Sequence, residues 1–431
     1  MGRMYDLIIL EPSSSEVGLR TAEHVCEFLR KDIRWAVAGR DIDEMGECVE
    51  GLKEMGGRSI PAIEICASTK EDIQALARRT KVIINMLDVG DGRGEMVVEA
   101  CAGNGTHYLD PASDIHWLGG MIRKYHDFAR ENKSIILSHV SVESTPQDLL
   151  SHCAVMELKN KLNLRTREVV CAINDFSYPP PASLSRPTAL LSTSSTSTSS
   201  ISTSSSASLK SPRHPPLNPW FLSHTQGRTC TASSLSTRAS PLRELTLGLL
   251  SPSTTLSSQQ TRVLVHRSWA LLDSGRCYGE DFYYNEYREV KACREGVREK
   301  MGLGWVKRLC CQEERRIGVG SSSSMSSLSS HESNMKGTSN GNGKSSISLR
   351  AIAIAAQEGP FPDRALAEFS YGNSAAHLTA AFLAEGAATI LYTKGLLKRV
   401  GGGGVLTPAV LGTEFVERLG RVGVEVRGEL V

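Results

Sequence analysis

Residues 4–23, MYDLIILEPSSSEVGLRTAE, set how the chain begins to fold. The apolar run at residues 7–10 predicts a buried parallel strand, and a turn of small and polar residues follows it. From Gly18 onward the residues have a helical pattern. A strand, a tight turn and a helix in this order are typical of the start of a dinucleotide-binding fold. In such folds the backbone amides of the turn and the N-terminus of the helix contact a pyrophosphate.

The same alternation of strand and helix patterns continues to about residue 175. Apolar runs predict strands at residues 34–40, 62–65, 82–86, 107–110 and 134–138. Amphipathic patterns predict helices between them, at residues 21–30, 42–55, 70–79, 95–104 and 115–132. Repeated strand–helix units with right-handed crossovers form one doubly wound parallel sheet. We therefore predict an α/β fold class with an N-terminal Rossmann domain.

The composition of the chain excludes several classes of function. A length of 431 residues allows two or three domains, and a net charge of +2 gives no reason to expect nucleic acid as a partner. The eleven cysteines form no CxxC pair and no signal-peptide pattern follows Met1, so we expect an intracellular protein. The longest apolar segment, residues 375–392, contains His377 and Glu385, which predicts a buried or interfacial helix rather than a membrane span.

The composition changes after residue 175. Residues 192–206 are Ser or Thr at every position except Ile201, and low complexity continues to about residue 260. A second tract of this kind covers residues 318–346. Such sequences bury too little apolar surface to offset the entropy of ordering, so we predict two disordered inserts.

The segments between and after the inserts predict a smaller α+β domain. Alternating apolar and polar residues predict a pair of antiparallel strands at residues 261–271 and 278–287. Three more strands are expected at residues 351–356, 365–371 and 422–427, two helices at 374–392 and 413–420, and a flexible glycine turn at 401–404. The predicted divisions of the chain are residues 1–177, 178–260, 261–317, 318–348 and 349–431.

Six motifs occur along the chain in a specific order. They are YDLIIL with GLRTAEHV near the start, WAVAGR at residues 35–40, VVEACAGNGTHYLD at 97–110, ESTPQDLL at 143–150 and GGGVLTPAVLG at 402–412. In this series the chain resembles the saccharopine dehydrogenase-like oxidoreductases, particularly their fungal members. The resemblance is nearly continuous over residues 4–176 and returns over about 261–290 and 350–431.

The resemblance implies an N-terminal Rossmann domain that binds NADP or NAD, a second α/β domain, and oxidoreductase activity. It leaves the substrate open, as a small molecule or a lipid-like compound. Association of relatives with lipid droplets or membranes implies a protein that is cytoplasmic or bound peripherally to such a surface. Formation of a homo-oligomer is left open.

Two loops differ from the family pattern. The glycine-rich turn, of the GATGFTG kind in relatives, is replaced by residues 11–18, EPSSSEVG, which brings Glu11 and Glu16 to the expected pyrophosphate position. Like charges at that range in a partly buried site cost on the order of 1–4 kcal/mol. The loop after the fourth strand, roughly VGPY in relatives, carries Asp88 and Asp91 instead.

Six residues are the predicted cofactor ligands: Ser13, Ser14, Gly18, Gly39, Arg40 and Asn85. The two serines are expected to donate hydrogen bonds to phosphate, and Gly18 to open the helix beside it. Arg40 follows the second strand and favours the 2′-phosphate of NADP, whereas the adjacent Asp41 would accept from the ribose of NAD. Asn85 ends the fourth strand, where it would contact the ribose or nicotinamide, or serve as an ordinary turn residue.

No nucleophile–base pair or metal-ligand spacing is evident in the sequence. His107 and Tyr108 are candidate general acids, with core packing as the alternative. Arg267 is a candidate ligand for an acidic substrate. Cys310 and the cysteine that follows it are candidates for acylation, with a basic surface patch as the alternative.

Two functions remain open on the sequence. The first is an NAD(P)-dependent oxidoreductase, in which the cofactor supplies hydride and the protein supplies orientation. The second is a non-catalytic relative that keeps the Rossmann scaffold for a structural or lipid-surface role, as the altered phosphate turn suggests.

Overall fold

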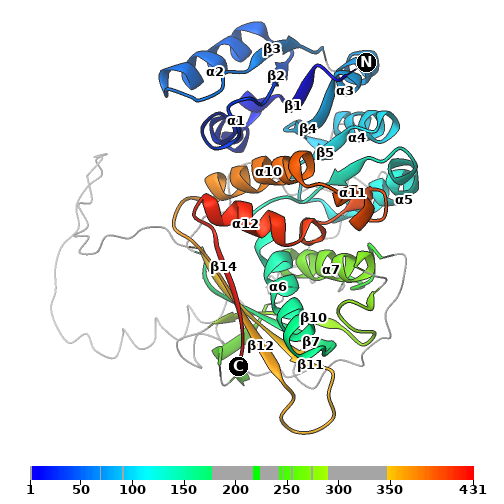
Figure 1. Ribbon diagram of the computed structural model, residues 1–431, viewed down its shortest axis with the longest axis vertical. Coiled ribbons are helices and arrows are strands. Elements are labelled where there is room, and N and C mark those ends of the chain that lie inside the picture. The colour runs from blue at the N-terminus through cyan, green and yellow to red at the C-terminus, as the bar shows by residue number, and fades with distance from the viewer. Residues whose placement is uncertain are drawn as a thin grey trace, which may run out of the picture.

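The computed structural model describes residues 2–67, 69–89, 92–176, 217–223, 242–244, 246–253, 256–272, 275–289 and 347–431. These residues form two seven-stranded sheets, one toward each end of an elongated molecule (Figure 1). Helices α10 and α12 lie between the sheets in the same view. The predicted disordered inserts lie outside the described residues, except for the short segments between residues 217 and 260.

The first sheet is parallel throughout and has the strand order β13-β6-β5-β4-β1-β2-β3. Its strands are β1 (Tyr5–Leu10), β2 (Trp35–Gly39), β3 (Ala62–Ile65), β4 (Thr80–Asn85), β5 (His107–Leu109), β6 (Ile135–Leu137) and β13 (Gly404–Leu406). The six strands of the N-terminal segment have the doubly wound order 3-2-1-4-5-6. The predicted Rossmann architecture is therefore confirmed.

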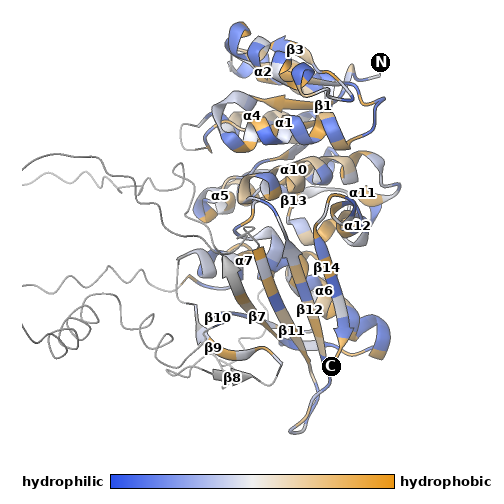
Figure 2. Ribbon diagram, turned by 90° about the vertical axis from the view of Figure 1, so that its left-hand side faces the viewer, coloured by the Kyte–Doolittle hydropathy of each residue, from blue (hydrophilic) through white to orange (hydrophobic). Residues whose placement is uncertain are grey.

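Alternate residues of the central strand face two layers of helices. Leu7 and Ile9 of β1 lie in one core cluster with residues of α1 (Glu16–Phe28) and α2 (Ile42–Glu54). Ile8 and Leu10 lie in a second cluster with the helices on the opposite face. Those helices are α3 (Lys70–Arg79), α4 (Arg93–Asn104) and α5 (Ile115–Glu131). Both faces are buried, which explains why the strands read as continuous apolar runs (Figure 2).

The second sheet has the order β14-β12-β11-β7-β10-β9-β8 and is mixed, because β10 runs parallel to β7 and the other pairs are antiparallel. Its strands are β7 (Thr166–Phe176), β8 (Leu242–Glu244), β9 (Gly248–Pro252), β10 (Tyr283–Glu289), β11 (Ile347–Ala355), β12 (Arg364–Tyr371) and β14 (Glu425–Leu430). Helix α6 (Thr145–Leu162) packs against β11, β12 and β14. The predicted α+β class of the second domain is confirmed.

Two local predictions in this domain are wrong. Residues 261–271 belong to a helix, α7 (Leu256–Leu271), instead of a strand. All the residues from Val263 to Ala270 are buried, so this helix has no exposed polar face to reveal its period. Residues 278–287 contribute a strand only from Tyr283, and that strand pairs with β7 and β9. The range 178–260, predicted to be low-complexity and mostly disordered, also contains β8, β9 and the start of α7.

The C-terminal segment serves both sheets. Gly404, predicted to lie in a flexible turn, begins β13, which pairs with β6 and extends the first sheet. The helix predicted at residues 374–392 is α10 (Ala375–Tyr392), and it packs against α1, β4 and β5 of that sheet. Residues 349–431 are therefore not confined to the second domain.

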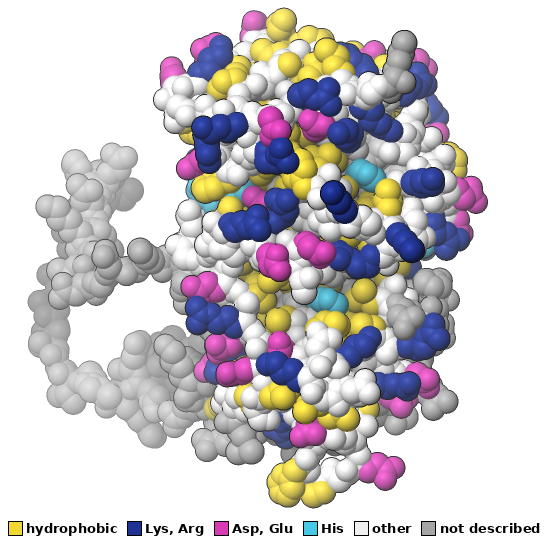
Figure 3. Space-filling view, viewed as in Figure 1, with side chains coloured by type: hydrophobic (Ala, Val, Ile, Leu, Met, Phe, Trp, Pro, Cys, Tyr) yellow, Lys and Arg dark blue, Asp and Glu magenta, His cyan; other side chains and the backbone are white. Residues whose placement is uncertain are grey.

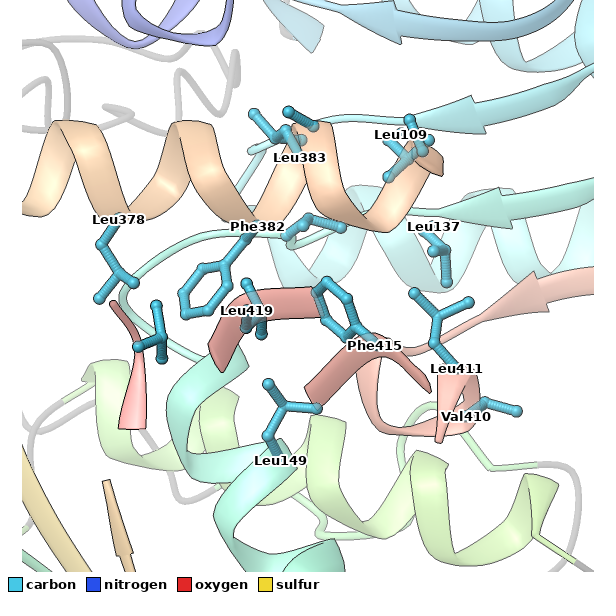
Figure 4. Close-up of a cluster of buried hydrophobic side chains, with 14 of the residues drawn as sticks. Leu109, Leu137, Leu149, Leu378, Phe382, Leu383, Val410, Leu411, Phe415 and Leu419 are labelled. Carbon is cyan, nitrogen blue, oxygen red and sulfur yellow. The ribbon is translucent and has the colours of Figure 1, made fainter. Parts of the chain in front are cut away.

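A cluster of apolar side chains joins the two halves (Figure 4). Leu378 and Phe382 of α10 point toward α12 in this cluster, whereas Leu383 lies on the other side of the helix. The opposite side of the cluster is formed by α6, by η5 (Pro408–Leu411) and by α12 (Thr413–Arg421), the last contributing Phe415 and Leu419. After α10 the chain forms the short helix α11 (Leu396–Arg399) before it enters β13.

A buried polar junction lies beside this cluster. The Asp148 carboxylate accepts hydrogen bonds from Ser268 Oγ at 2.6 Å and from the Ala409 amide at 2.9 Å. Arg267, a candidate substrate ligand from sequence, is 1% exposed and donates to the carbonyl oxygens of Leu222 and Val405 at 3.0 and 2.9 Å. These hydrogen bonds connect α7 to the backbone at Leu222 and Val405.

Within the part of the chain that the structure describes, no helix has both the length and the apolar character needed to cross a bilayer. The same residues contain no group of three or more His, Cys, Asp or Glu arranged to hold a metal ion. On the face seen in Figure 3, basic and acidic side chains are interspersed without a continuous basic stripe.

Replacing Asp148 with Asn is expected to change how stability depends on pH. Burial raises the pKa of Asp148 to about 7, whereas the unfolded chain has a value of about 4. The unfolded state therefore loses this proton first, and Asp148 makes the fold less stable as pH rises from about 4 to about 7. Relative to Asp148→Asn, the wild-type unfolding free energy should fall between pH 5 and pH 8 in urea titrations.

The matched control is Asp127→Asn, because the Asp127 side chain is 75% exposed. This variant should follow the pH dependence of the wild type. If the unfolding free energy of the wild type, relative to that of Asp148→Asn, stays constant or rises with pH, the raised pKa of Asp148 is contradicted.

Candidate functional site

The turn after β1 has a compact structure of its own. Glu11 adopts a left-handed conformation with φ 54° and ψ 52°, a region that non-glycine residues rarely occupy. Residues Pro12–Ser14 then form the 3-10 helix η1. Ser15 caps helix α1, because its Oγ accepts a hydrogen bond from the Gly18 amide at 3.1 Å.

Gly18 allows the helix to start against this turn. A Cβ atom at Gly18 would lie 2.2 Å from the carbonyl oxygen of Pro12, far inside contact distance. The absence of a side chain is therefore required for packing between α1 and η1. Its predicted role beside a phosphate stays a prediction.

The hydroxyl groups of the turn contact protein atoms. Ser13 Oγ donates to a carboxylate oxygen of Glu44 at 3.1 Å, and Ser14 Oγ donates to the Met86 carbonyl at 3.0 Å. Either serine would have to exchange this partner in order to donate to a phosphate. Their assignment as phosphate ligands also stays a prediction.

Glu11 and Arg40 form an ion pair across the ends of β1 and β2. Glu11 is 5% exposed, and its Oε1 accepts from the backbone amide and the Nε of Arg40 at 3.3 and 3.2 Å. Gly39 provides the space, since a Cβ there would lie 3.3 Å from Glu11 Oε2 and 2.8 Å from the methyl carbon of Met45. Sequence reasoning identified Gly39 and Arg40 but missed this pairing, because Glu11 was interpreted only as a repulsive charge.

A cavity of about 510 Å³ opens at this point, lined by Glu11, Arg40, Asp41, Ile42 and Glu44. It lies at the carboxyl ends of β1 and β2, where doubly wound sheets bind ligands. Asp41 caps α2 by accepting from the amides of Asp43 and Glu44. Ile42 is 61% exposed and gives the cavity an apolar surface. Ile42 and Glu44 were not predicted as site residues. Their positions directly after β2 are the feature of the sequence that could have identified them.

Asn85 lies apart from this cavity, in a buried network at the ends of β4, β5 and β6. Its Nδ2 donates to Tyr108 Oη at 3.1 Å. Asp110 accepts from Ser138 Oγ at 2.8 Å and from the Ala112 amide at 2.9 Å. Burial raises the pKa of Tyr108 well above its usual value and also raises the pKa of Asp110. Asn85 is fully buried, so the structure shows no open contact surface for it.

The other candidate residues from sequence either contact neighbouring protein groups or lie outside the residues that the structure describes. His107 Nδ1 accepts from the Ile135 amide at 3.0 Å, and burial lowers the pKa of His107 to about 4. Tyr108 is fully buried, which favours the core-packing alternative for this residue. Cys310 and its neighbour lie outside the described residues.

The packing at Gly18 can be tested against a second helical glycine. Gly18→Ala is expected to destabilise the fold by about 1–3 kcal/mol, because the turn must move to admit the methyl group. Gly46→Ala is the matched control. A Cβ on Gly46, inside α2, would meet nothing within 4 Å beyond the backbone of its own helix, so alanine should stabilise that helix. Urea unfolding measures both changes, and equal stability of Gly18→Ala and wild type would contradict the packing.

Comparison with known proteins bears on this domain. Residues 17–137 match the family model described as the saccharopine dehydrogenase NADP binding domain. The chain is 31% identical over 146 residues to the saccharopine dehydrogenase-like oxidoreductase of Mus musculus, covering 33% of each chain. It is 26% identical over 153 residues to the lipid droplet localized protein of Caenorhabditis elegans, covering 34% of this chain and 35% of that one. The matches thus span about a third of the relatives' length.

The fold of the whole chain has a counterpart among solved structures. Apo saccharopine dehydrogenase (L-Glu forming) from Saccharomyces cerevisiae superimposes with a TM-score of 0.51. The alignment covers 99% of this chain and all of that one at 9% sequence identity, so the likeness concerns the fold alone. The motif series, the family model and the mouse relative all indicate a likeness to saccharopine dehydrogenase-like proteins. Residues 17–137 are therefore similar to a domain of the saccharopine dehydrogenase NADP-binding type.

Proposed function

We propose that this protein binds a nicotinamide–adenine dinucleotide and acts as an oxidoreductase. The observation that carries the proposal is the cavity at the ends of β1 and β2, lined by Glu11, Arg40 and Asp41. Its volume of about 510 Å³ lies within the range of small-molecule sites. The similarity of residues 17–137 to an NADP-binding domain family supports the same proposal.

The lining of the cavity fits the adenosine half of such a cofactor. Ile42 offers an apolar surface to the adenine ring, and the Arg40 guanidinium, on a side chain that is 60% exposed, can stack on it. Carboxylates of Asp41 and Glu44 are acceptors for ribose hydroxyl groups. The N-terminus of α1 is the part of this edge suited to the pyrophosphate.

When bound, the cofactor would supply or accept hydride. The chain would hold the adenosine in the cavity and orient the rest of the cofactor along the carboxyl edge of the sheet. The substrate would be a small molecule or a lipid-like compound. The name of the Caenorhabditis elegans relative supports a place at a lipid-droplet or membrane surface, as a further part of this proposal.

The alternative is a non-catalytic scaffold, and one observation favours it. Ser13 and Ser14 already donate to Glu44 and to the Met86 carbonyl, and Gly18 is used for packing. A pyrophosphate would then have to rely on backbone amides alone. Cofactor binding distinguishes the two functions.

The test is calorimetric titration of the full chain with NADH and with NADPH. We expect saturable binding with a Kd below about 1 mM for at least one dinucleotide. Ile42→Glu should weaken this binding about tenfold or more, because it adds a charge where the adenine would lie. Absence of binding at millimolar concentrations of either dinucleotide would overturn the proposal and support the scaffold.

Met55→Glu provides the matched control for Ile42→Glu. Both side chains are exposed, at 53% and 61%, and they lie at opposite ends of α2. Met55→Glu should bind the dinucleotide as the wild type does. Equal losses in the two variants would show an effect on the helix rather than on the cavity, and would count against the site.

A further inference from the structure

We infer that Glu11 makes this cavity select a nucleotide with a free ribose 2′-hydroxyl, so that NAD(H) binds in preference to NADP(H). The inference rests on the proposed function, because it concerns the same cavity. It gives Glu11 a specific role: its carboxylate compensates the arginine that would otherwise attract a 2′-phosphate.

The Glu11 carboxylate lies directly beside the Arg40 guanidinium. Glu11 Oε1 lies 3.3 Å from the backbone nitrogen of Arg40 and 3.2 Å from its Nε, and accepts hydrogen bonds from both. The Glu11 side chain is 6% exposed, whereas that of Arg40 is 60% exposed. The carboxylate is buried whereas the guanidinium is largely in contact with solvent, so solvent screens the attraction between them only in part.

The charged groups that line the cavity are mostly acidic. Among the described residues, its lining contains the carboxylates of Glu11, Asp41 and Glu44 and a single cationic group, that of Arg40. Two negative charges remain after Arg40 is paired. A 2′-phosphate brings further negative charge and no hydrogen to donate, so it is repelled.

Hydrogen bonding also favours a ribose with free hydroxyl groups in this cavity. A ribose with free 2′- and 3′-hydroxyls has two donors, and carboxylates are acceptors when ionised. An acidic side chain near the end of the second strand is the feature that binds ribose hydroxyls in NAD-type sites. Asp41 and Glu44 both follow β2 closely and line the cavity. The same groups that repel the phosphate therefore attract the hydroxyls.

The opposing possibility is that Glu11 only orients Arg40, leaving the terminal nitrogens of the guanidinium for a 2′-phosphate. The two cases predict different NADPH affinities after the Glu11 charge is removed. Glu11→Gln keeps an oxygen that accepts from the Arg40 amide and Nε, and abolishes the charge. If Glu11 orients Arg40, this variant should bind NADPH no better than the wild type.

The experiment measures Kd for NADH and NADPH in wild type, Glu11→Gln and Glu47→Gln. Glu47 lies exposed on α2 and does not line the cavity, so it controls for net charge. We expect wild type to bind NADH about tenfold more tightly than NADPH, and Glu11→Gln to improve NADPH binding about tenfold with little change for NADH. Glu47→Gln should keep the wild-type ratio.

Wild type that binds NADPH as tightly as NADH would overturn the inference, as would Glu11→Gln without improved NADPH binding. Glu11→Gly is a second variant in case glutamine perturbs the turn, since glycine readily adopts the left-handed conformation at this position. It should shift the ratio in the same direction.

Titration with 5′-AMP and with adenosine 2′,5′-bisphosphate separates this inference from the proposed function. If neither dinucleotide binds but 5′-AMP binds more tightly than the bisphosphate, the proposed function fails and the selectivity of the cavity stands. If dinucleotides bind but the bisphosphate is preferred over 5′-AMP, the inference fails and the proposed function stands. If none of these ligands binds, both fail.

Discussion

The burial of α10 on two sides holds the two halves of the molecule together. One side of this helix packs against α1, β4 and β5 of the first sheet, and another contacts α12 and η5 (Figure 4). Its small residues permit the close approach: a Cβ on Gly386 would lie 3.0 Å from Leu109. Because α10 is fixed there, the chain after it returns to the first sheet as β13.

The packing of α10 also determines which part of the carboxyl edge of the first sheet stays open. Thr379 of α10 accepts a hydrogen bond from the Val142 amide at 3.2 Å, beside the ends of β5 and β6. The network of Asn85, Tyr108 and Asp110 is accordingly buried. At the ends of β1 and β2, by contrast, the structure has a cavity of about 510 Å³. Glu11 and Arg40 line this cavity.

The turn after β1 places an ion-paired glutamate in a backbone conformation that glutamate rarely adopts. Glu11 occupies a left-handed conformation that costs an L-residue roughly 1–2 kcal/mol. Its ion pair with the half-exposed Arg40 contributes no more than about 1 kcal/mol, since exposed pairs are weak. Stability therefore does not explain the residue by itself. Its effect on the charge of the cavity gives a functional reason for an otherwise unfavourable conformation.

Local sequence patterns were sufficient for the N-terminal architecture, because its six apolar strands and their helices have clear periodicity and short connecting turns. Gly39 and Arg40 were placed correctly at the end of β2 for the same reason. The helical state of residues 261–271 became evident only in the folded molecule, since a helix buried on all sides carries no polar stripe. The pairing of β13 with β6 and of Glu11 with Arg40 also required the folded molecule. Those contacts join residues that are far apart in the chain, so the local order of apolar and polar residues does not predict them.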